Sequence, residues 1–477
     1  MSYDMKNNQV QFKYKALVQE FTSKIRNGSF RPGDKLPSIR TLHKELQLSV
    51  STVYLAYSEL EKSGLVAARP KSGYFVKPMS VFEIPEAPRT DPRPVHVTLS
   101  SMVASTLTDN RDSEMVHLGT STPAPELLPV KALSRIMKRI KADEMPHLLD
   151  YSLAEGDPEL RRGISRLSLG VMDGVGPGDI IVTQGSMEAL TLSLRCVTRP
   201  GDVVAIDSPT HLGYLQLLQE LGLMALEIPA DPRYGTDVEG LARVLAHRKV
   251  DAYLLVSNFQ NPTGALMPEE QKKRLVELTH THGIPVIEDN LFGDLYFGRH
   301  RPLSLKKYDQ KDLVIACSSF SKTVSPGLRV GWVVPGRRFY RKILGLRTGT
   351  TIAASTLDQY LIMRFLKEGE YDRYMRKLRG AVKQQMDGIA TAIRRHFPAG
   401  TRLALPEGGS LLWVELDRTV DSLALFHAAR EKKIAIAPGI FFSVTDHFNH
   451  FIRIGCGFPF TDRTEWGIKT LGELMVG

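Results

Sequence analysis

The stretch that decides the fold covers residues 318–332 and reads SSFSKTVSPGLRVGW. Apolar runs lie on both sides of it, at residues 313–316 and 330–334, and each has the length and composition of a buried strand. Lys322 therefore falls on a polar turn at the end of a strand. Open α/β sheets place their functional groups at such ends.

The side chains of this turn suit one kind of ligand. A lysine in such a place can lose its proton and condense with an aldehyde. Ser319, Ser321 and Arg329 add hydroxyls and a guanidinium, which can bind a phosphate through two parallel hydrogen bonds. A ligand with both an aldehyde and a phosphate is pyridoxal 5'-phosphate (PLP), so we expect Lys322 to hold PLP covalently. The alternative is an ordinary loop lysine, and the partner residues below argue against it.

Length and composition narrow the class of protein. The chain has 477 residues, too many for one ordinary domain, and 42% of them are hydrophobic. No apolar run reaches the length of a membrane span, and no signal peptide opens the sequence. The three cysteines, Cys196, Cys317 and Cys456, have neither metal-site nor disulfide spacing. We expect a cytoplasmic protein without a metal site.

The positive charge of the chain is concentrated near the N-terminus. The net charge is +10, and residues 1–78 carry 13 Lys and Arg against 6 Asp and Glu, a net +7. A small basic module suggests a polyanionic partner. Charge alone is also typical of a solvated surface, so the fold of this module has to decide between the two.

Residues 10–78 have the pattern of three short helices and a hairpin. Apolar residues recur at helical spacing from residue 14 to 25, Ser38 can cap a second helix, and Ser49 can cap a third. Two short strands with a basic turn between them follow. This order predicts a winged helix-turn-helix, whose third helix enters the major groove of DNA.

The winged helix geometry assigns DNA contacts to three places. The start of the third helix would face base edges or phosphates, the start of the second helix would contact the backbone, and the wing would add phosphate contacts. The residues predicted for these contacts are Ser49, Val50, Ser51, Thr52 and Tyr54, then Ser38 and Arg40, then Arg69 and Lys71.

The module resembles the GntR family of bacterial transcription regulators. The resemblance rests on residues 36–40 (LPSIR), 49–57 and 73–76 (GYFV). Gln47 and Val50 depart from the family pattern, which usually has glycine and often has arginine at these positions. The missing arginine leaves the operator sequence open. The alternative is a winged helix used only for protein contacts.

The rest of the chain predicts a linker and an α/β domain. Prolines and mixed charges interrupt residues 79–114, which we interpret as a tether. In residues 115–477, strand-like apolar runs alternate with amphipathic helices. That alternation is typical of a mostly parallel sheet covered on both faces.

Polar clusters follow nearly every predicted strand of this domain. Gly185, Ser186 and Met187 open a helix after the first strand, where free backbone amides can bind the phosphate of PLP. Asn261 follows the third strand and can donate to the phenolic oxygen of the cofactor. Asp289 follows the fourth strand and can pair with the pyridine nitrogen, which maintains the electron sink. An asparagine, an acid and a lysine in this order make the joint pattern specific.

Together these motifs resemble those of fold-type I aminotransferases, and the resemblance implies further roles. It places His211 where an aromatic residue stacks on the pyridine ring. It implies that Tyr151 reaches the cofactor phosphate of the partner subunit and that Arg453 binds the α-carboxylate of a substrate. Gly119 would belong to the loop that closes over the substrate. For His211 the alternative is a surface turn, and for Arg453 it is a structural salt bridge.

One position departs from the resembling enzymes. They carry a tyrosine two or three residues after the aspartate, hydrogen-bonded to the phenolic oxygen, where this chain has Leu291 and Phe292. Loss of that hydroxyl should raise the pKa of the lysine–cofactor imine and weaken control of the electron sink. We hypothesise that the site has drifted away from fast transamination.

A GntR-like module joined to an aminotransferase-like domain is the arrangement of the MocR subfamily of bacterial regulators. The resemblance implies a small C-terminal α/β subdomain and a head-to-tail homodimer, with each DNA-binding module docked on the other subunit. We predict a PLP-dependent regulator that binds double-stranded operator DNA and senses PLP, an amino acid or an amine. The alternative is an aminotransferase whose N-terminal module is vestigial or only localises it. The effector, the operator and the sign of regulation stay open.

Overall fold

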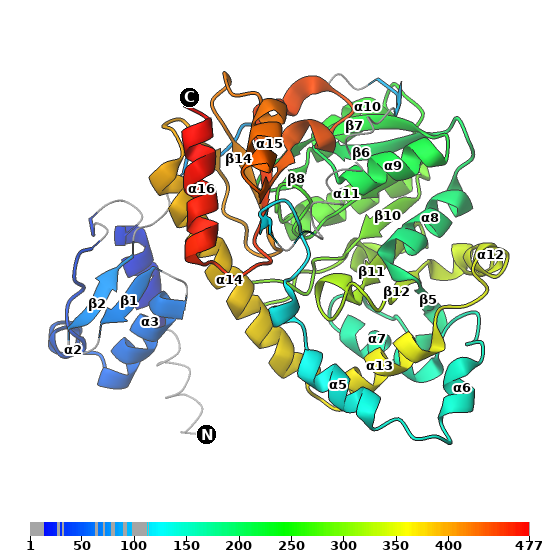
Figure 1. Cartoon of the computed structure of the whole chain (residues 1–477), viewed down its shortest axis with the longest axis horizontal. Coiled ribbons are helices and arrows are strands. Elements are labelled where there is room, and N and C mark those ends of the chain that lie inside the picture. The colour runs from blue at the N-terminus through cyan, green and yellow to red at the C-terminus, as the bar shows by residue number, and fades with distance from the viewer. Residues whose placement is uncertain are drawn as a thin grey trace. The chain divides into compact units, whose positions relative to one another are not determined.

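The computed structural model divides the chain into two compact units, Met1–Val81 and Phe82–Gly477, and each is described by itself (Figure 1). Within the described ranges every helix is too short or too polar to span a membrane. No group of three or more His, Cys, Asp or Glu side chains in these ranges could hold a metal ion. The described residues are 14–25, 29–30, 33–62, 65–69, 72–77, 82–88, 93–97, 112 and 114–476.

The N-terminal unit has the predicted helices and hairpin. The helices cover residues 14–25, Ile39–Leu46 (α2) and Val50–Lys62 (α3). Strand β1 (Val66–Arg69) pairs antiparallel with β2 (Gly73–Val76) to form the wing. The winged helix-turn-helix prediction is therefore confirmed at the level of the fold.

Two serines start the second and third helices of this unit. The Oγ of Ser38 accepts a hydrogen bond from the amide of Thr41 at 3.1 Å, and the Oγ of Ser49 accepts one from the amide of Thr52 at 3.1 Å. These N-caps satisfy amides that have no partner inside the helix. Between the two helices Gln47 has a φ of 51°, in the left-handed region that favours glycine. The turn of the helix-turn-helix thus forms here without a glycine.

The large unit is built on a sheet with nine strands among the described residues. Its central strands run parallel, as predicted, and the strands near both edges run antiparallel to their neighbours. Along the sheet the order is β3 (Val95–His96), β7 (Met224–Asp231), β6 (Val203–Ser208), β9 (Ala252–Leu255), β10 (Val286–Asp289), β11 (Val314–Ser319), β12 (Gly331–Val334) and β5 (Ile181–Thr183), with β8 (Gly235–Thr236) paired to β7.

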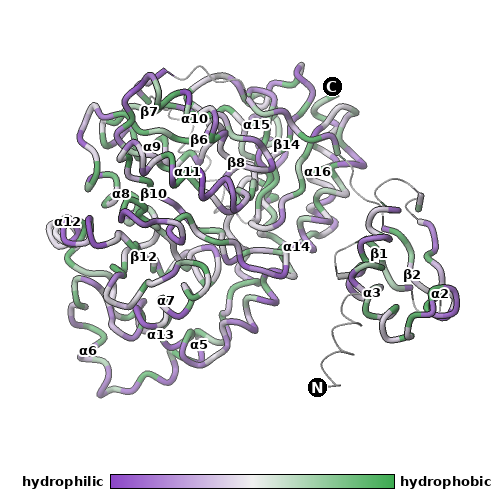
Figure 2. Tube along the Cα trace, turned by 180° about the vertical axis from the view of Figure 1, so that it is seen from behind, coloured by the Kyte–Doolittle hydropathy of each residue, from purple (hydrophilic) through white to green (hydrophobic). Residues whose placement is uncertain are grey.

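Helices cover both faces of this sheet, and successive strand residues point into different cores. Ile206 and Ile315 belong to the core under one set of helices, whereas Ala205 and Val314 belong to the core under another. Such double burial explains why these strands are apolar runs rather than alternating ones. Figure 2 shows hydrophobic and hydrophilic residues alternating along the surrounding helices, as expected for helices with one buried face. These helices are α5 (Val130–Lys138), α6 (Met145–Leu149), α7 (Pro158–Ser168), α8 (Gly185–Val197), α9 (Leu212–Glu220), α10 (Val238–Leu245), α11 (Glu269–His282), α12 (Gly336–Thr348) and α13 (Thr356–Lys367).

Lys322 lies in the connection between β11 and β12, which are neighbours and run antiparallel. An antiparallel return needs only a short loop, whereas a parallel partner needs a crossover of about a dozen or more residues. Ser319 pairs with Gly331 at the base of this loop, and Gly331 also pairs with Thr183 of β5. The loop is thereby fixed at the same edge of the sheet as the carboxyl ends of the parallel strands.

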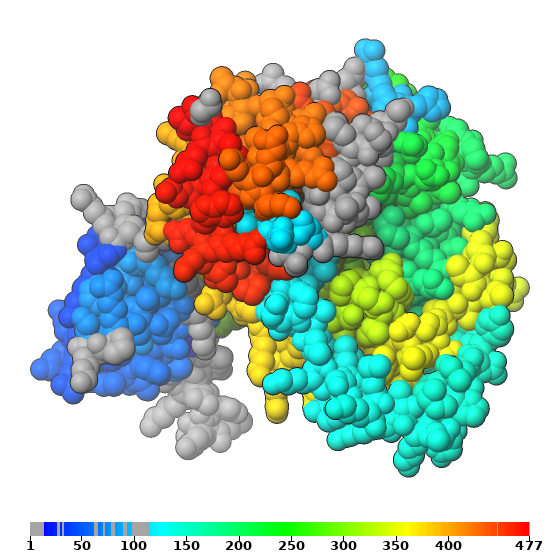
Figure 3. All heavy atoms as spheres, in the orientation of Figure 1, coloured from blue at the N-terminus to red at the C-terminus, as the bar shows by residue number. Residues whose placement is uncertain are grey.

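A smaller α/β subdomain forms the C-terminal part of the unit, as predicted. Its antiparallel sheet is covered by α15 and α16, which lie together on one face in Figure 3. The long helix α14 leads into it, and a short parallel pair, β4 with β15, joins it to the start of the domain. The bounds are α14 (Tyr371–His396), β13 (Arg402–Leu403), β14 (Leu411–Glu415), α15 (Ser422–Glu431), β15 (Ile434–Ala435), β16 (Ala437–Pro438), β17 (Phe451–Gly455), α16 (Asp462–Leu474) and β4 (Val116–His117).

Part of the expected linker is attached to the large unit. Strand β3 adds an antiparallel edge strand to β7, and the carbonyl of Glu83 accepts a hydrogen bond from the amide of Leu403 at 2.9 Å. Proline-rich sequences tolerate edge positions because an edge strand needs hydrogen bonds on one side only. The described parts of residues 79–114 are therefore docked segments rather than a free tether.

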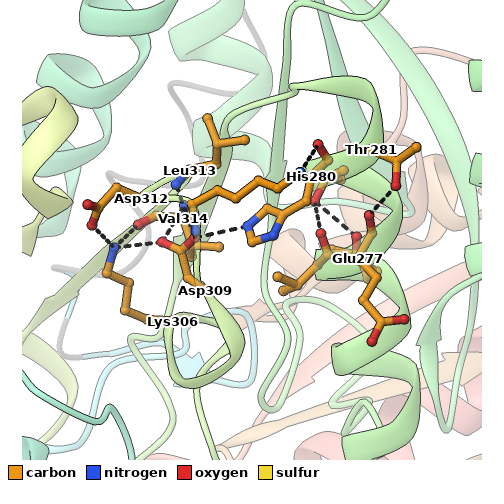
Figure 4. Close-up of polar contacts among 12 residues, drawn as sticks. Glu277, His280, Thr281, Lys306, Asp309, Asp312, Leu313 and Val314 are labelled. Atoms are coloured by element: carbon orange, nitrogen blue, oxygen red, sulfur yellow. Dashed lines mark hydrogen bonds and ion pairs between the residues drawn. The ribbon is translucent and has the colours of Figure 1, made fainter.

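A buried ion cluster holds the amino end of β11 (Figure 4). The Asp309 carboxylate, fully buried, accepts hydrogen bonds from His280 Nε2 at 2.9 Å, Lys306 Nζ at 2.8 Å and the amide of Val314 at 2.9 Å. Burial by itself would raise the pKa of Asp309, but Lys306 and the backbone amides hold that pKa below its usual value. The cluster joins the end of α11 to the start of β11, whose opposite end leads into the loop that carries Lys322.

We expect Asp309→Asn to lower the free energy of unfolding of the large unit by about 3 kcal/mol, because it removes the buried counter-charge of the Lys306 amine and leaves only the distant, half-exposed Asp312 carboxylate. Urea denaturation at pH 7 measures this loss. Because the folded-state pKa is lowered, the Asp309 contribution is complete above the unfolded value of about 4 and is lost as the pH falls through the folded value. The difference between the variant and the natural chain should therefore shrink below about pH 4.

Asp312→Asn is the matched control, since Asp312 is 45% exposed and lies 4.0 Å from the same amine. It should change the free energy of unfolding by less than about 0.5 kcal/mol. Equal losses in the two variants would contradict the assignment of the cluster to Asp309.

Candidate functional site

The residues predicted after the strands meet in one cavity of about 160 Å³ at the carboxyl edge of the central strands. A larger cavity of about 540 Å³, lined by residues such as Lys272 and Pro406, contains none of them, so volume alone would not find the site. The predicted residues that line the smaller cavity are Ser186, Met187, His211, Asn261, Asp289, Ser321, Lys322 and Arg329.

Lys322 ends a short 3₁₀ turn, Phe320–Lys322, that directly follows β11. Its amine donates to the Oγ of Ser121 at 3.0 Å and to the Oγ1 of Thr122 at 3.3 Å. Burial, and then the charge of Arg453, lower the pKa of Lys322 to about 8. Roughly a tenth of such amines are uncharged at pH 7, far more than for an exposed lysine. This lysine is therefore prepared to attack a carbonyl group.

One end of the cavity is suited to a phosphate. Arg329 Nη1 donates to Ser321 Oγ at 3.5 Å, and its Nη2 donates to the carbonyl of Gln184 at 3.3 Å. Gly185, the first residue of α8, has a φ of 78°, and a Cβ on it would lie 2.5 Å from Arg329 Nη2. Only glycine leaves this space open, and the free amides of the first turn of α8 begin at the same point.

Ser319 has a supporting position at this end of the cavity. Its hydroxyl donates to the hydroxyl of Ser321 at 2.8 Å and accepts from the amide of Ser321 at 2.9 Å. The side chain of Ser319 is 2% exposed and is not part of the cavity lining. In this arrangement the Ser319 hydroxyl is bonded to Ser321, and its direct contact with a phosphate stays a prediction.

The Asp289 carboxylate lies at the end of β10 and is 5% exposed. One oxygen accepts from the Tyr214 hydroxyl at 2.8 Å and the other accepts from the amide of Leu291 at 3.1 Å. Burial raises the pKa of Asp289 to about 6, while these hydrogen bonds oppose the rise. No cation among the described residues forms an ion pair with this carboxylate. A protonated ring nitrogen would provide the missing counter-charge.

Arg453 reaches the site from β17 of the small subdomain. Its Nη1 donates to Asn261 Oδ1 at 3.1 Å and its Nη2 donates to the carbonyl of Gly119 at 2.5 Å. Its guanidinium carbon lies 4.9 Å from the centre of the Phe442 ring, and its buried Nε has no hydrogen-bond partner. Burial lowers the pKa of Arg453 to about 10. In the described part of the chain Arg453 forms no salt bridge, which argues against a purely structural role.

His211 is the N-cap residue of α9 and lines the cavity. Its ring lies 5.2 Å from that of Tyr214 in an edge-on contact, and Gly213 leaves the space that the ring occupies, since a Cβ there would lie 2.7 Å from His211 Cε1. Burial, and then the charges of Arg453 and Lys322, lower the pKa of His211 to about 3. A neutral imidazole therefore stands where stacking on a pyridine ring was predicted.

Tyr214 was missed from the sequence, although it follows His211 by three residues and so shares its helix face. Leu291 and Phe292 do line the cavity and bring no hydroxyl to it. Tyr151 is 79% exposed and does not line this cavity, so a single chain does not test its predicted contact with a partner's cofactor.

The predicted DNA-contact residues divide by exposure. Val50 is 50% exposed and Tyr54 is 55% exposed, and Ser38, Arg40, Ser49, Ser51 and Arg69 are exposed as well. Thr52 is only 2% exposed, and its hydroxyl is hydrogen-bonded to that of Ser49 at 2.7 Å. The prediction that Thr52 faces DNA is therefore wrong, because its side chain is packed under the helix start. Lys71 lies outside the described residues.

The fold and the cavity define a fold-type I aminotransferase-like domain. Two families match the chain by sequence: "Bacterial regulatory proteins, gntR family" over residues 13–76, and "Aminotransferase class I and II" over residues 113–462. The chain therefore belongs to the aminotransferase class I and II family and carries a gntR-family module, which is the architecture of the MocR regulators.

Relatives of both kinds are similar to this chain. The HTH-type transcriptional regulator YjiR of Escherichia coli is 35% identical over 97% of this chain and 98% of that protein. YdcR, another HTH-type transcriptional regulator of Escherichia coli, is 34% identical over 97% of this chain and 99% of that protein. The structure of the alpha-aminoadipate aminotransferase LysN from Thermus thermophilus matches with a TM-score of 0.74 at 28% identity, covering 80% of this chain and 96% of that one.

Borohydride reduction of the chain mixed with PLP should attach the cofactor to Lys322, and Lys322→Ala should lose both the attachment and the visible absorbance of the bound cofactor. Peptide mapping by mass spectrometry locates the label. Lys272 is an internal control because burial also lowers its pKa to about 8 while it lines the other cavity. A label on Lys272, or visible colour that survives in Lys322→Ala, would show that the site is assigned wrongly.

Proposed function

We propose that this chain is a PLP-dependent transcription regulator that binds DNA through residues 10–78 and holds PLP at Lys322. The observation that carries the proposal is that one chain has both an exposed helix-turn-helix surface and a cavity in which three groups converge. These groups are a lysine of lowered pKa, an asparagine and a buried acid that has no ion-pair partner among the described residues. The relatives that match over nearly the whole chain carry transcription regulator names, which supports this reading.

The residues of the cavity fit PLP group by group. Lys322 would hold the aldehyde carbon, Asp289 the ring nitrogen and Asn261 the phenolic oxygen. Ser186, Ser321 and Arg329, together with the amides that open α8, would hold the phosphate. The cofactor supplies an electron-withdrawing ring when it is bound. The related LysN structure is complexed with N-(5'-phosphopyridoxyl)-L-leucine, a compound of the same kind.

The effector we propose is an amino acid or an amine. The two acceptors of the Arg453 guanidinium, an amide oxygen and a carbonyl, are both neutral. A carboxylate would give this buried guanidinium its first charged partner, through two parallel hydrogen bonds. Amino acids are therefore the favoured class of effector. A spectral titration of the PLP-loaded chain with candidate amino acids would identify the particular one.

A homodimer fits the exposed apolar residues of the large unit. Leu149, Tyr151 and Leu153 alternate along one segment and are 76%, 79% and 57% exposed. The Oγ1 of Thr356 donates to the carbonyl of Asp150 at 2.7 Å, which fixes this segment to α13. Exposed apolar patches of this kind are typical of protein interfaces. We propose a head-to-tail dimer in which Tyr151 reaches the partner's cofactor phosphate and each DNA-binding module docks on the other subunit.

An aminotransferase remains the second candidate function, because Asn261, Asp289, Lys322 and Arg453 are all in place. Leu291 and Phe292 favour the regulator, since they deprive the phenolic oxygen of the hydroxyl that controls the electron sink. The two candidates differ in whether DNA binding or turnover is the main property of the chain.

In a gel shift on the DNA upstream of its own gene, we expect a complex that weakens as salt increases and that changes when PLP is added. Arg40→Ala should weaken binding to all sequences alike and lower the slope of log K against log salt by about 1, because Arg40 would contact phosphates. Lys322→Ala is the matched control, which should keep the complex and lose the response to PLP. Absence of a salt-sensitive complex on any promoter fragment would favour the enzyme.

In a steady-state transaminase assay with amino acids, we expect turnover below about 1 per second, the lower end of typical enzyme rates. Phe292→Tyr, which offers a hydroxyl at the position where related enzymes have one, should increase the rate. Turnover of the natural chain at ordinary enzyme rates would support the second candidate function instead.

A further inference from the structure

We propose that Tyr214 is a positioning residue that limits how strongly Asp289 engages the ring nitrogen of PLP. The inference rests on the proposed function, in which PLP occupies the cavity at Lys322, and it concerns the electronic control of that site. It assigns a role to a side chain that the strand-end pattern of the sequence did not identify.

The contact between the two side chains is short and excluded from water. Tyr214 is 2% exposed, lies in the first turn of α9 and donates its hydroxyl to Asp289 Oδ2 at 2.8 Å. Both side chains line the cavity, so the hydrogen bond is made where the ring nitrogen would also be bound. With the Leu291 amide on the other oxygen, each carboxylate oxygen already has one neutral donor.

The direction of the effect on the ring nitrogen follows from the fact that Tyr214 donates the hydrogen bond and the Asp289 carboxylate accepts it. A donor to a carboxylate stabilises its charged form and disperses its negative charge. Once the Tyr214 hydrogen bond has dispersed this negative charge, the carboxylate stabilises a proton on the ring nitrogen less strongly. A less protonated ring withdraws electrons less strongly, so Tyr214 weakens the electron sink.

Tyr214 also contacts the predicted stacking residue. Its ring meets that of His211 edge-on, at 5.2 Å between centres and with 75° between planes. One side chain therefore holds both the acid that faces the ring nitrogen and the imidazole predicted to lie against the ring. A change at this position would act on both groups together.

This placement complements the absence of a hydroxyl at Phe292. The hydroxyl expected beside the phenolic oxygen is missing, while a hydroxyl is present beside the acid. The missing hydroxyl weakens control of the electron sink at the phenolic oxygen, and the Tyr214 hydroxyl weakens the sink at the ring nitrogen. Such a site would bind PLP and amines, but the later steps of transamination would be slow. These properties suit a sensor better than an enzyme.

The chain contains a matched control pair. Tyr253 donates its hydroxyl to Asp207 Oδ1 at 2.7 Å, both side chains are buried, and burial raises the pKa of Asp207 to about 6, as it does for Asp289. Neither Tyr253 nor Asp207 lines the cavity. Removal of the Tyr253 hydroxyl therefore deletes an equivalent buried tyrosine–aspartate hydrogen bond at a place that does not contact the cofactor.

The test compares Tyr214→Phe and Tyr253→Phe in the full chain loaded with PLP that carries ¹⁵N at the ring nitrogen. The pH at which the ¹⁵N resonance moves from the protonated to the unprotonated position is measured by solid-state NMR. A hydrogen bond to a charged group is strong enough to shift the pKa of a group coupled to that charge by about one unit. We expect Tyr214→Phe to raise the midpoint by about one unit and Tyr253→Phe to leave it unchanged.

Replacement of Tyr214 by 3,5-difluorotyrosine keeps the shape of the side chain and strengthens the donor, so it should move the midpoint downwards and tests the inference even if Tyr214→Phe folds poorly. A natural chain that takes up no PLP would overturn the proposed function and this inference together. Uptake of PLP with the same midpoint in all the variants, or equal shifts in Tyr214→Phe and Tyr253→Phe, would overturn this inference alone.

Discussion

The register between β10 and β11 is the constraint on which the site depends. Asp289 is opposite Cys317 in that register, so the acid and the loop that carries Lys322 emerge at the same edge of the sheet. Because successive strand residues alternate between the two faces, a slip of one residue would turn Asp289 away from the cavity and expose core side chains to polar surroundings. The packing of the cores on the two faces therefore fixes the strand register, and with it the position of Asp289 relative to the loop that carries Lys322.

Burial gives this edge its chemistry. It lowers the pKa of Lys322 and of His211 and raises that of Asp289, so each group is shifted towards its neutral form. Such shifts cost stability, and proteins tolerate them where a ligand restores the charges. A ligand with an aldehyde, an aromatic ring and a ring nitrogen would match Lys322, His211 and Asp289 in turn, whereas water matches none of them well.

Site residues that directly follow a strand could be predicted from the sequence, because the carboxyl ends of parallel strands meet at one edge of the sheet however the helices pack. Lys322, Asn261 and Asp289 were found in that way. Tyr214 was missed because a tyrosine at helical spacing in an apolar helix is usually a core residue. Thr52 was misplaced because exposure on a short helix depends on how the module packs. The docking of β3 depends on an edge strand far away in sequence, which local composition does not reveal.

The contacts of the loop at residues 119–122 show how ligand binding can reach the linker. This loop accepts hydrogen bonds from both charged groups of the site, since Lys322 donates to the Ser121 hydroxyl and Arg453 donates to the Gly119 carbonyl. A ligand that takes over these two partners has to displace the loop, which β4 joins to the small subdomain. The same subdomain holds the first described linker segment through Leu403. An effector can shift this arrangement only by its difference in affinity between the two loop positions.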